Sequence, residues 1–143
     1  MTLPVPVTII MIEDDEGHAR LIERNIRRSG IHNEIIPFTT GADALGYLFG
    51  DAAKPEGLLI LLDLNLPDMT GIEILRQVKD NRVLKSAPVV VLTTTDDSNE
   101  IKRCYELGCN VYITKPVNSE SLANAIRQLG LFFSVIQVPP TEP

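Results

Sequence analysis

The feature that most constrains the fold is a regular alternation of short apolar runs with amphipathic stretches. The apolar runs have the length of strands and are rich in β-branched residues. The expected strands cover residues 7–13, 34–38, 58–63, 88–93 and 110–114. Helical periodicity lies between them, and the expected helices cover residues 16–29, 41–49, 71–80, 97–107 and 119–130. This alternation predicts an α/β fold with a parallel sheet and helices on both of its faces.

The composition of the strands predicts their order in the sheet. The runs 58–62 and 89–92 are apolar throughout, which favours central positions. The run 34–38 contains Pro37, which lacks the N–H of a sheet ladder and therefore favours an edge. A doubly wound, flavodoxin-like sheet of order 2-1-3-4-5 satisfies both conditions. In that order ligand chemistry is expected between Asp14 and Asp63, at the switch point.

The ends of the first and last predicted helices carry recognisable signals. Asp15 is placed to cap the first helix and Gly30 to stop it, while Arg27 falls on its solvent face. Either Asn118 or Ser119 can cap the last helix.

The bulk composition excludes several classes of protein. The chain has 143 residues, enough for one domain with a real core, and its net charge of −6 argues against a nucleic-acid partner. No apolar run approaches the ~20 residues of a membrane helix, so no membrane association is expected. Cys104 and Cys109 match no metal spacing and are expected to be free thiols, which fits a cytoplasmic location.

Polar residues stand where four of the predicted strands end. Glu13 and Asp14 follow the first strand, Asp63 ends the third, Thr93 the fourth, and Lys115 follows the fifth. The carboxyl ends of parallel strands converge on one edge of a sheet, so these side chains are expected to meet. Together they can bind a divalent cation, with Mg²⁺ expected, and carry a phosphoryl group on Asp63.

Each of these residues taken alone has an ordinary structural explanation. Asp63 can cap a loop, an acidic pair suits a helix N-terminus, and Thr93 is a good strand residue. A lysine such as Lys115 is usually solvated. The following Pro116 changes this expectation, because a cis Lys-Pro bond would aim the lysine inward, and we expect that bond to be cis.

The order and spacing of these motifs resemble a response-regulator receiver domain of two-component signalling. The resemblance covers residues 1–130. It implies that Asp63 is the phosphoacceptor, and that Asp14, Asp63 and the backbone carbonyl of Asn65 ligate Mg²⁺ with help from Glu13 through water. It also implies that Thr93 and Lys115 bind the phosphoryl group and that Thr93 and Tyr112 act as switch residues. The family usually has Ala after the threonine, where this chain has Thr94.

Two other classes of function compete with this interpretation. An aspartyl-phosphate phosphatase of the haloacid-dehalogenase type places a second acid two residues after its nucleophile, and this chain has Asn65 there. A pseudo-receiver that serves only as a scaffold would not need the intact acid set. The expected role is therefore that of a switched binding module rather than an enzyme.

The segment after the last predicted helix forms a separate unit of residues 131–143, too short for an effector domain. We expect it to be an apolar arm that supports a homodimer, although it can also fold back on its own domain. The arm residues are Phe132, Phe133, Val135, Ile136 and Val138. This arrangement is similar to stand-alone receivers paired with phytochrome-type histidine kinases. A sensor histidine kinase and a downstream protein are therefore the expected partners.

Overall fold

The computed structural model describes residues 7–55 and 57–130. The strands are β1 (Val7–Ile12), β2 (Ile35–Phe38), β3 (Gly57–Leu62), β4 (Val89–Thr93) and β5 (Val111–Thr114). The helices are α1 (Glu16–Arg28), α2 (Gly41–Leu48), α3 (Gly71–Asp80), α4 (Ser98–Leu107) and α5 (Ser119–Gly130). A short 3-10 helix, η1 (Leu84–Ser86), precedes β4 and was not expected from the sequence.

All the strand pairs are parallel, and their order is β2-β1-β3-β4-β5, which confirms the predicted topology. β2 lies at the edge of the sheet, with Pro37 opposite Met11 of β1. The missing N–H of the proline therefore does not interrupt the hydrogen bonds between interior strands. Every residue of β3 and β4 is buried, as their apolar sequences require.

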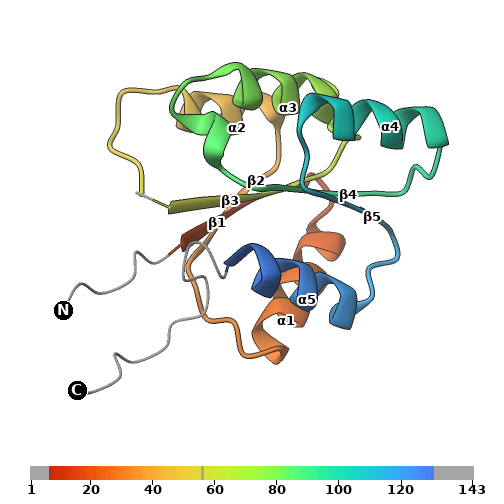
Figure 1. Cartoon of the computed structure of the whole chain (residues 1–143). Coiled ribbons are helices and arrows are strands. Elements are labelled where there is room, and N and C mark those ends of the chain that lie inside the picture. Colours follow the sequence, from red (N-terminus) through yellow and green to blue (C-terminus); the bar gives the residue numbers. More distant parts are fainter. Residues whose placement is uncertain (1–6, 56, 131–143) are drawn as a thin grey trace.

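Helices cover both faces of this sheet, with α2, α3 and α4 on one face and α1 and α5 on the other (Figure 1). Alternate residues of β1 serve the two sides: Ile10 and Ile12 pack in the core under α2 and α3, and Ile9 and Met11 pack under α1 and α5. The sheet is therefore fixed from both faces, which makes the carboxyl edge of its strands a rigid platform.

The helix ends follow the predicted signals, whereas one side chain predicted to face solvent does not. The Asp15 carboxylate accepts a hydrogen bond from the His18 N–H at 2.9 Å, and Gly30 adopts a φ of 85° just after α1. The Asn118 side chain accepts the Ser121 N–H at the start of α5. Arg27 differs from expectation because its guanidinium folds back and donates to two backbone carbonyls instead of facing water.

The predicted arm of residues 131–143 lies outside the described residues. Within the part of the chain that the structure describes, no helix has the length and apolar character needed to cross a membrane.

Candidate functional site

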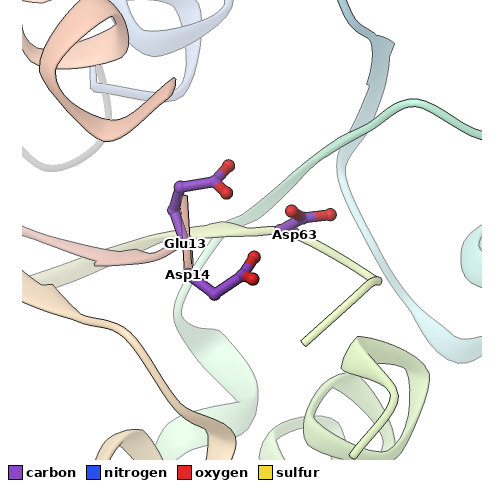
Figure 2. Close-up of side chains that lie close together, drawn as sticks. All are labelled: Glu13, Asp14 and Asp63. Atoms are coloured by element: carbon purple, nitrogen blue, oxygen red, sulfur yellow. The ribbon is translucent and has the colours of Figure 1, made fainter. Parts of the chain in front are cut away.

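Three carboxylates meet at the carboxyl edge of the sheet, between β1 and β3 (Figure 2). Glu13 and Asp14 directly follow β1 and Asp63 directly follows β3, so the pairing of these neighbouring strands brings them together. One oxygen from each lies within 4.8 Å of the others. Glu13 and Asp63 are buried and Asp14 is exposed, which gives the cluster one side open to solvent.

The carboxylates differ in how their oxygens are used. One Glu13 oxygen accepts from the Lys115 ammonium at 2.5 Å, and the other accepts from the Asp15 N–H at 3.1 Å. Asp63 accepts from the Asn65 N–H at 3.1 Å and from Lys115 at 3.3 Å. Among residues 7–55 and 57–130, the Asp14 side chain has no hydrogen-bond or ion-pair partner. Asp14 therefore has the most freely available oxygens of the three.

The electrostatics of the cluster favour a bound cation. Burial raises the pKa of Glu13, the Lys115 hydrogen bond opposes this rise, and the nearby Asp63 charge adds to it. Crowded carboxylates repel one another unless a positive charge lies between them. An all-oxygen set with one open side fits a hard divalent ion that keeps several of its waters.

Lys115 reaches the cluster from the end of β5 through a cis peptide bond to Pro116, as the sequence analysis expects. Its side chain is only 7% exposed, so it is not a solvated surface lysine. The ammonium contacts Asp63 at 3.3 Å and lies closer to Glu13, at 2.5 Å. Glu13 has a longer side chain than Asp63 and contacts the lysine from the end of β1.

Thr93 and Asn65 lie on the other side of Asp63. Thr93 is fully buried, and its hydroxyl oxygen accepts from the Asn65 side-chain amide at 3.3 Å. The sequence predicts that both residues lie near Asp63. In the structure, Asn65 contacts both Asp63 and Thr93. Their roles toward a phosphoryl group, and that of the Asn65 carbonyl toward a metal, stay predictions.

Tyr112 on β5 packs against the core beneath α4. Its hydroxyl donates to the Thr95 carbonyl at 2.7 Å, in the loop that follows β4, and burial raises its pKa above the ordinary range. The Tyr112 hydroxyl therefore connects β5 to the loop after Thr93. Its role as a switch stays a prediction.

Sequence reasoning missed two polar residues near the site. His18 in the first turn of α1 places its Nδ1 atom 3.2 Å from the Lys115 ammonium and 4.0 Å from Glu13. Asp68 accepts the N–H groups of Gly41 and Ala42, each at 2.8 Å, and so ties the loop after β3 to the start of α2. These two bonds lower the pKa of Asp68.

The first of these residues could have been found, because the first turn after a strand-end acid faces the same edge of the sheet.

The comparison with known protein families agrees with this geometry. The family described as the response regulator receiver domain matches residues 9–127. The chain belongs to this family.

Curated and solved relatives support the assignment. Response regulator Rcp1 of Synechocystis sp. is 35% identical over 133 residues, which is 90% of this chain and 89% of Rcp1. A receiver domain from Rhodospirillum rubrum is 67% identical with a TM-score of 0.75, and the match covers 95% of this chain and 99% of that one. The bacteriophytochrome response regulator RtBRR is 38% identical with a TM-score of 0.78, over 97% of this chain and 85% of that one.

Receiver domains bind a divalent metal ion, and the acidic cluster of this receiver domain fits that property. A structure of Rcp1 in its Mn²⁺-bound form, 34% identical with a TM-score of 0.73, covers 94% of this chain and 100% of that one.

The backbone of α3 closely approaches the loop that follows Asp63. A Cβ atom on Gly71, the first residue of α3, would lie 2.3 Å from the Asp63 carbonyl oxygen and 2.7 Å from the Leu64 Cα. Both neighbours are backbone atoms, so neither can turn away. Gly71 also donates its N–H to the Leu64 carbonyl at 2.8 Å.

We expect Gly71→Ala to lower the free energy of unfolding by about 1–3 kcal/mol, because the methyl group forces the Asp63–Leu64 backbone to move. Gly46→Ala in α2 is the matched control, since a Cβ there meets nothing within 4 Å. It should raise stability by about 0.5–1 kcal/mol. Urea unfolding of both variants measures this, and equal effects of the two changes would show that the close approach is unimportant.

Proposed function

We propose that this receiver domain accepts a phosphoryl group on Asp63 from a sensor histidine kinase and thereby switches its contacts with other proteins. The observation that carries the proposal is a buried Asp63 that lies beside the acid pair and 3.3 Å from the Lys115 ammonium. A nucleophile needs this environment because the incoming group is negative and must be neutralised where it arrives.

The reaction transfers one phosphoryl group between two protein side chains. An Asp63 carboxylate oxygen attacks phosphorus, a P–O bond forms, and the P–N bond to the kinase histidine breaks. The electron pair of that bond returns to the imidazole nitrogen. Lys115 would bind a phosphoryl oxygen by a charge-assisted hydrogen bond, which its contact with Asp63 supports, and the Thr93 hydroxyl would donate another.

We propose Mg²⁺ as the metal, held by Asp14, Asp63 and the Asn65 carbonyl, with Glu13 acting through water. When bound, it would neutralise charge on the acids and on the phosphoryl oxygens. Glu13 is suited to an indirect role because it is buried and lies closer to the Lys115 ammonium, at 2.5 Å, than Asp63 does at 3.3 Å. Asp14 is suited to direct ligation because its carboxylate is open to solvent.

Two observations favour a switch over a phosphatase-type enzyme. Asn65 occupies the position where such an enzyme has its second acid, and an amide cannot act as a general acid or base at neutral pH. Its amide instead donates to Thr93. The covalent product should therefore accumulate, and its electrostatic effect should bias a neighbouring surface.

Incubation with acetyl phosphate separates the three candidate functions. A receiver should gain the mass of one phosphoryl group when Mg²⁺ is present and gain none when EDTA removes it. An enzyme would release inorganic phosphate over many turnovers without a stable mass increase. A pseudo-receiver scaffold would neither label nor release phosphate, and either of the last two results would overturn the proposal.

We further propose a kinase of the phytochrome type, because two similar proteins are a bacteriophytochrome response regulator and a phosphorylated cyanobacterial phytochrome response regulator. The second, RcpA, is 34% identical to this chain.

We also propose that the protein forms a homodimer. The sequence of residues 131–143 supports it, since burying each large apolar side chain contributes about 1.5–3 kcal/mol.

Truncation after Leu131 should therefore convert a dimer into a monomer that still labels at Asp63. Truncation after Pro140 is the matched control, since it keeps every apolar arm residue and should leave the dimer intact. Analytical ultracentrifugation at low micromolar concentration measures both. If the protein truncated after Leu131 stays fully dimeric, the arm is not the main contact.

A further inference from the structure

His18 makes a contact with the phosphoryl-binding lysine that the family resemblance does not explain. Its Nδ1 atom lies 3.2 Å from the Lys115 ammonium nitrogen. His18 belongs to the first turn of α1, whose position is fixed because the Asp15 carboxylate caps the helix by accepting the His18 N–H. The imidazole side chain is 49% exposed, whereas that of Lys115 is 7% exposed. His18 therefore contacts Lys115 from the solvent side.

The chemistry of the two groups fixes the direction of the hydrogen bond. A lysine ammonium can only donate, so Nδ1 of His18 must accept. A histidine that accepts at Nδ1 is neutral and carries its proton on Nε2. The contact therefore selects one tautomer of His18.

The lysine ammonium has three N–H bonds and, in this structure, three acceptors. They are Glu13 at 2.5 Å, His18 at 3.2 Å and Asp63 at 3.3 Å. The first two acceptors belong to the strand end and helix start on the β1 side of the site. The third belongs to the side chain on which the phosphoryl group would be placed.

We propose that His18 is a positioning residue for phosphoryl transfer. Together with Glu13 it holds two N–H bonds of Lys115 on the β1 side, so that the third points to Asp63 and is free to pass to an arriving phosphoryl oxygen. The proposal rests on the phosphorylation of Asp63 proposed above. His18 acts through Lys115 and touches neither the nucleophile nor phosphorus.

Loss of the Nδ1 acceptor should slow the reaction. One N–H of the lysine would then lack a partner, and the ammonium would move closer to the Asp63 oxygen that it already contacts at 3.3 Å. A tighter ion pair there occupies the nucleophile and the space that the phosphoryl oxygen needs. The expected loss corresponds to one hydrogen bond, which is about three- to tenfold in rate.

The test uses the full chain with His18→Leu, His18→Asn and Arg20→Leu. Asn places its Oδ1 acceptor the same number of bonds from the backbone as Nδ1, so His18→Asn should restore the contact. Arg20 is an exposed residue of the same helix and serves as the control for an added apolar side chain. Initial labelling rates with acetyl phosphate and saturating Mg²⁺ are compared, and Mg²⁺ affinity is measured by calorimetry.

We expect His18→Leu to label about three- to tenfold more slowly than the wild type, with His18→Asn and Arg20→Leu within about twofold of it. All variants should keep the wild-type Mg²⁺ affinity, which a general structural defect would not allow. Nitrogen NMR of the wild-type imidazoles, His18 and His32, should show the Nε2–H tautomer for His18 when neutral.

Labelling of His18→Leu at or above the wild-type rate, or failure of His18→Asn to restore the rate, would overturn the role of His18 while leaving the proposed function intact. A wild type that does not label at all would instead overturn the proposed function, and with it this inference.

Discussion

Asp63→Asn should not acquire a phosphoryl group from acetyl phosphate, while the wild type labels once. The change removes the nucleophilic carboxylate but keeps the size and shape of the side chain. We expect no neighbouring acid to replace it, because Asp63 is the carboxylate of the cluster that contacts both Lys115 and the N–H of Asn65, whose side chain in turn contacts Thr93. Intact-mass spectrometry with Mg²⁺ present measures the difference.

Asp68→Asn is the matched control for this prediction. Asp68 lies five residues further along the same loop, and its carboxylate caps the start of α2 instead of facing the acid cluster. The control should label as the wild type does. Labelling of Asp63→Asn to the wild-type extent would show that another carboxylate is the acceptor.

Asp14→Asn should weaken Mg²⁺ binding by more than about 100-fold, and Glu13→Gln by about tenfold. A residue that acts through water typically contributes about 10–100-fold to metal affinity, and a direct ligand contributes more. The structure separates the roles, since Asp14 is exposed without a partner among residues 7–55 and 57–130 and Glu13 is buried and paired with Lys115. Calorimetric titration of the two amide variants with Mg²⁺ measures both affinities.

Asp43→Asn provides the control for charge alone, because Asp43 is an exposed acid in the first turn of α2. It removes one negative charge without touching the cluster and should bind Mg²⁺ as the wild type does. A greater loss of affinity for Glu13→Gln than for Asp14→Asn would exchange the two roles.

The strand order was predictable because the amino-acid composition of three strands indicates whether each lies at an edge or inside the sheet. Pro37 places β2 at an edge, and the unbroken apolar sequences of β3 and β4 place them inside the sheet. The 3-10 helix η1 was not predictable in this way. It begins where the Asn81 side chain accepts the N–H groups of Val83 and Leu84, a local turn with no periodicity to read.

The membership of the acid cluster was predictable because parallel strands end at one edge. The details of its contacts depend on side-chain length and helix placement, which a sequence pattern does not contain. The sequence therefore did not show that Lys115, which contacts Asp63, lies closer to Glu13, and it did not show the contact of His18. Arg27 was assigned to solvent because of helical periodicity, yet the carbonyls of Ile31 and Asn33 lie within its reach.

The central claim is that the phosphoryl group resides on Asp63, and chemical mapping tests it most directly. Borohydride reduces an aspartyl phosphate to homoserine, which marks the modified position in the peptide sequence. After labelling with acetyl phosphate and Mg²⁺, reduction and digestion, the account predicts homoserine at position 63 alone. Homoserine at another aspartate, with position 63 unchanged, would contradict it.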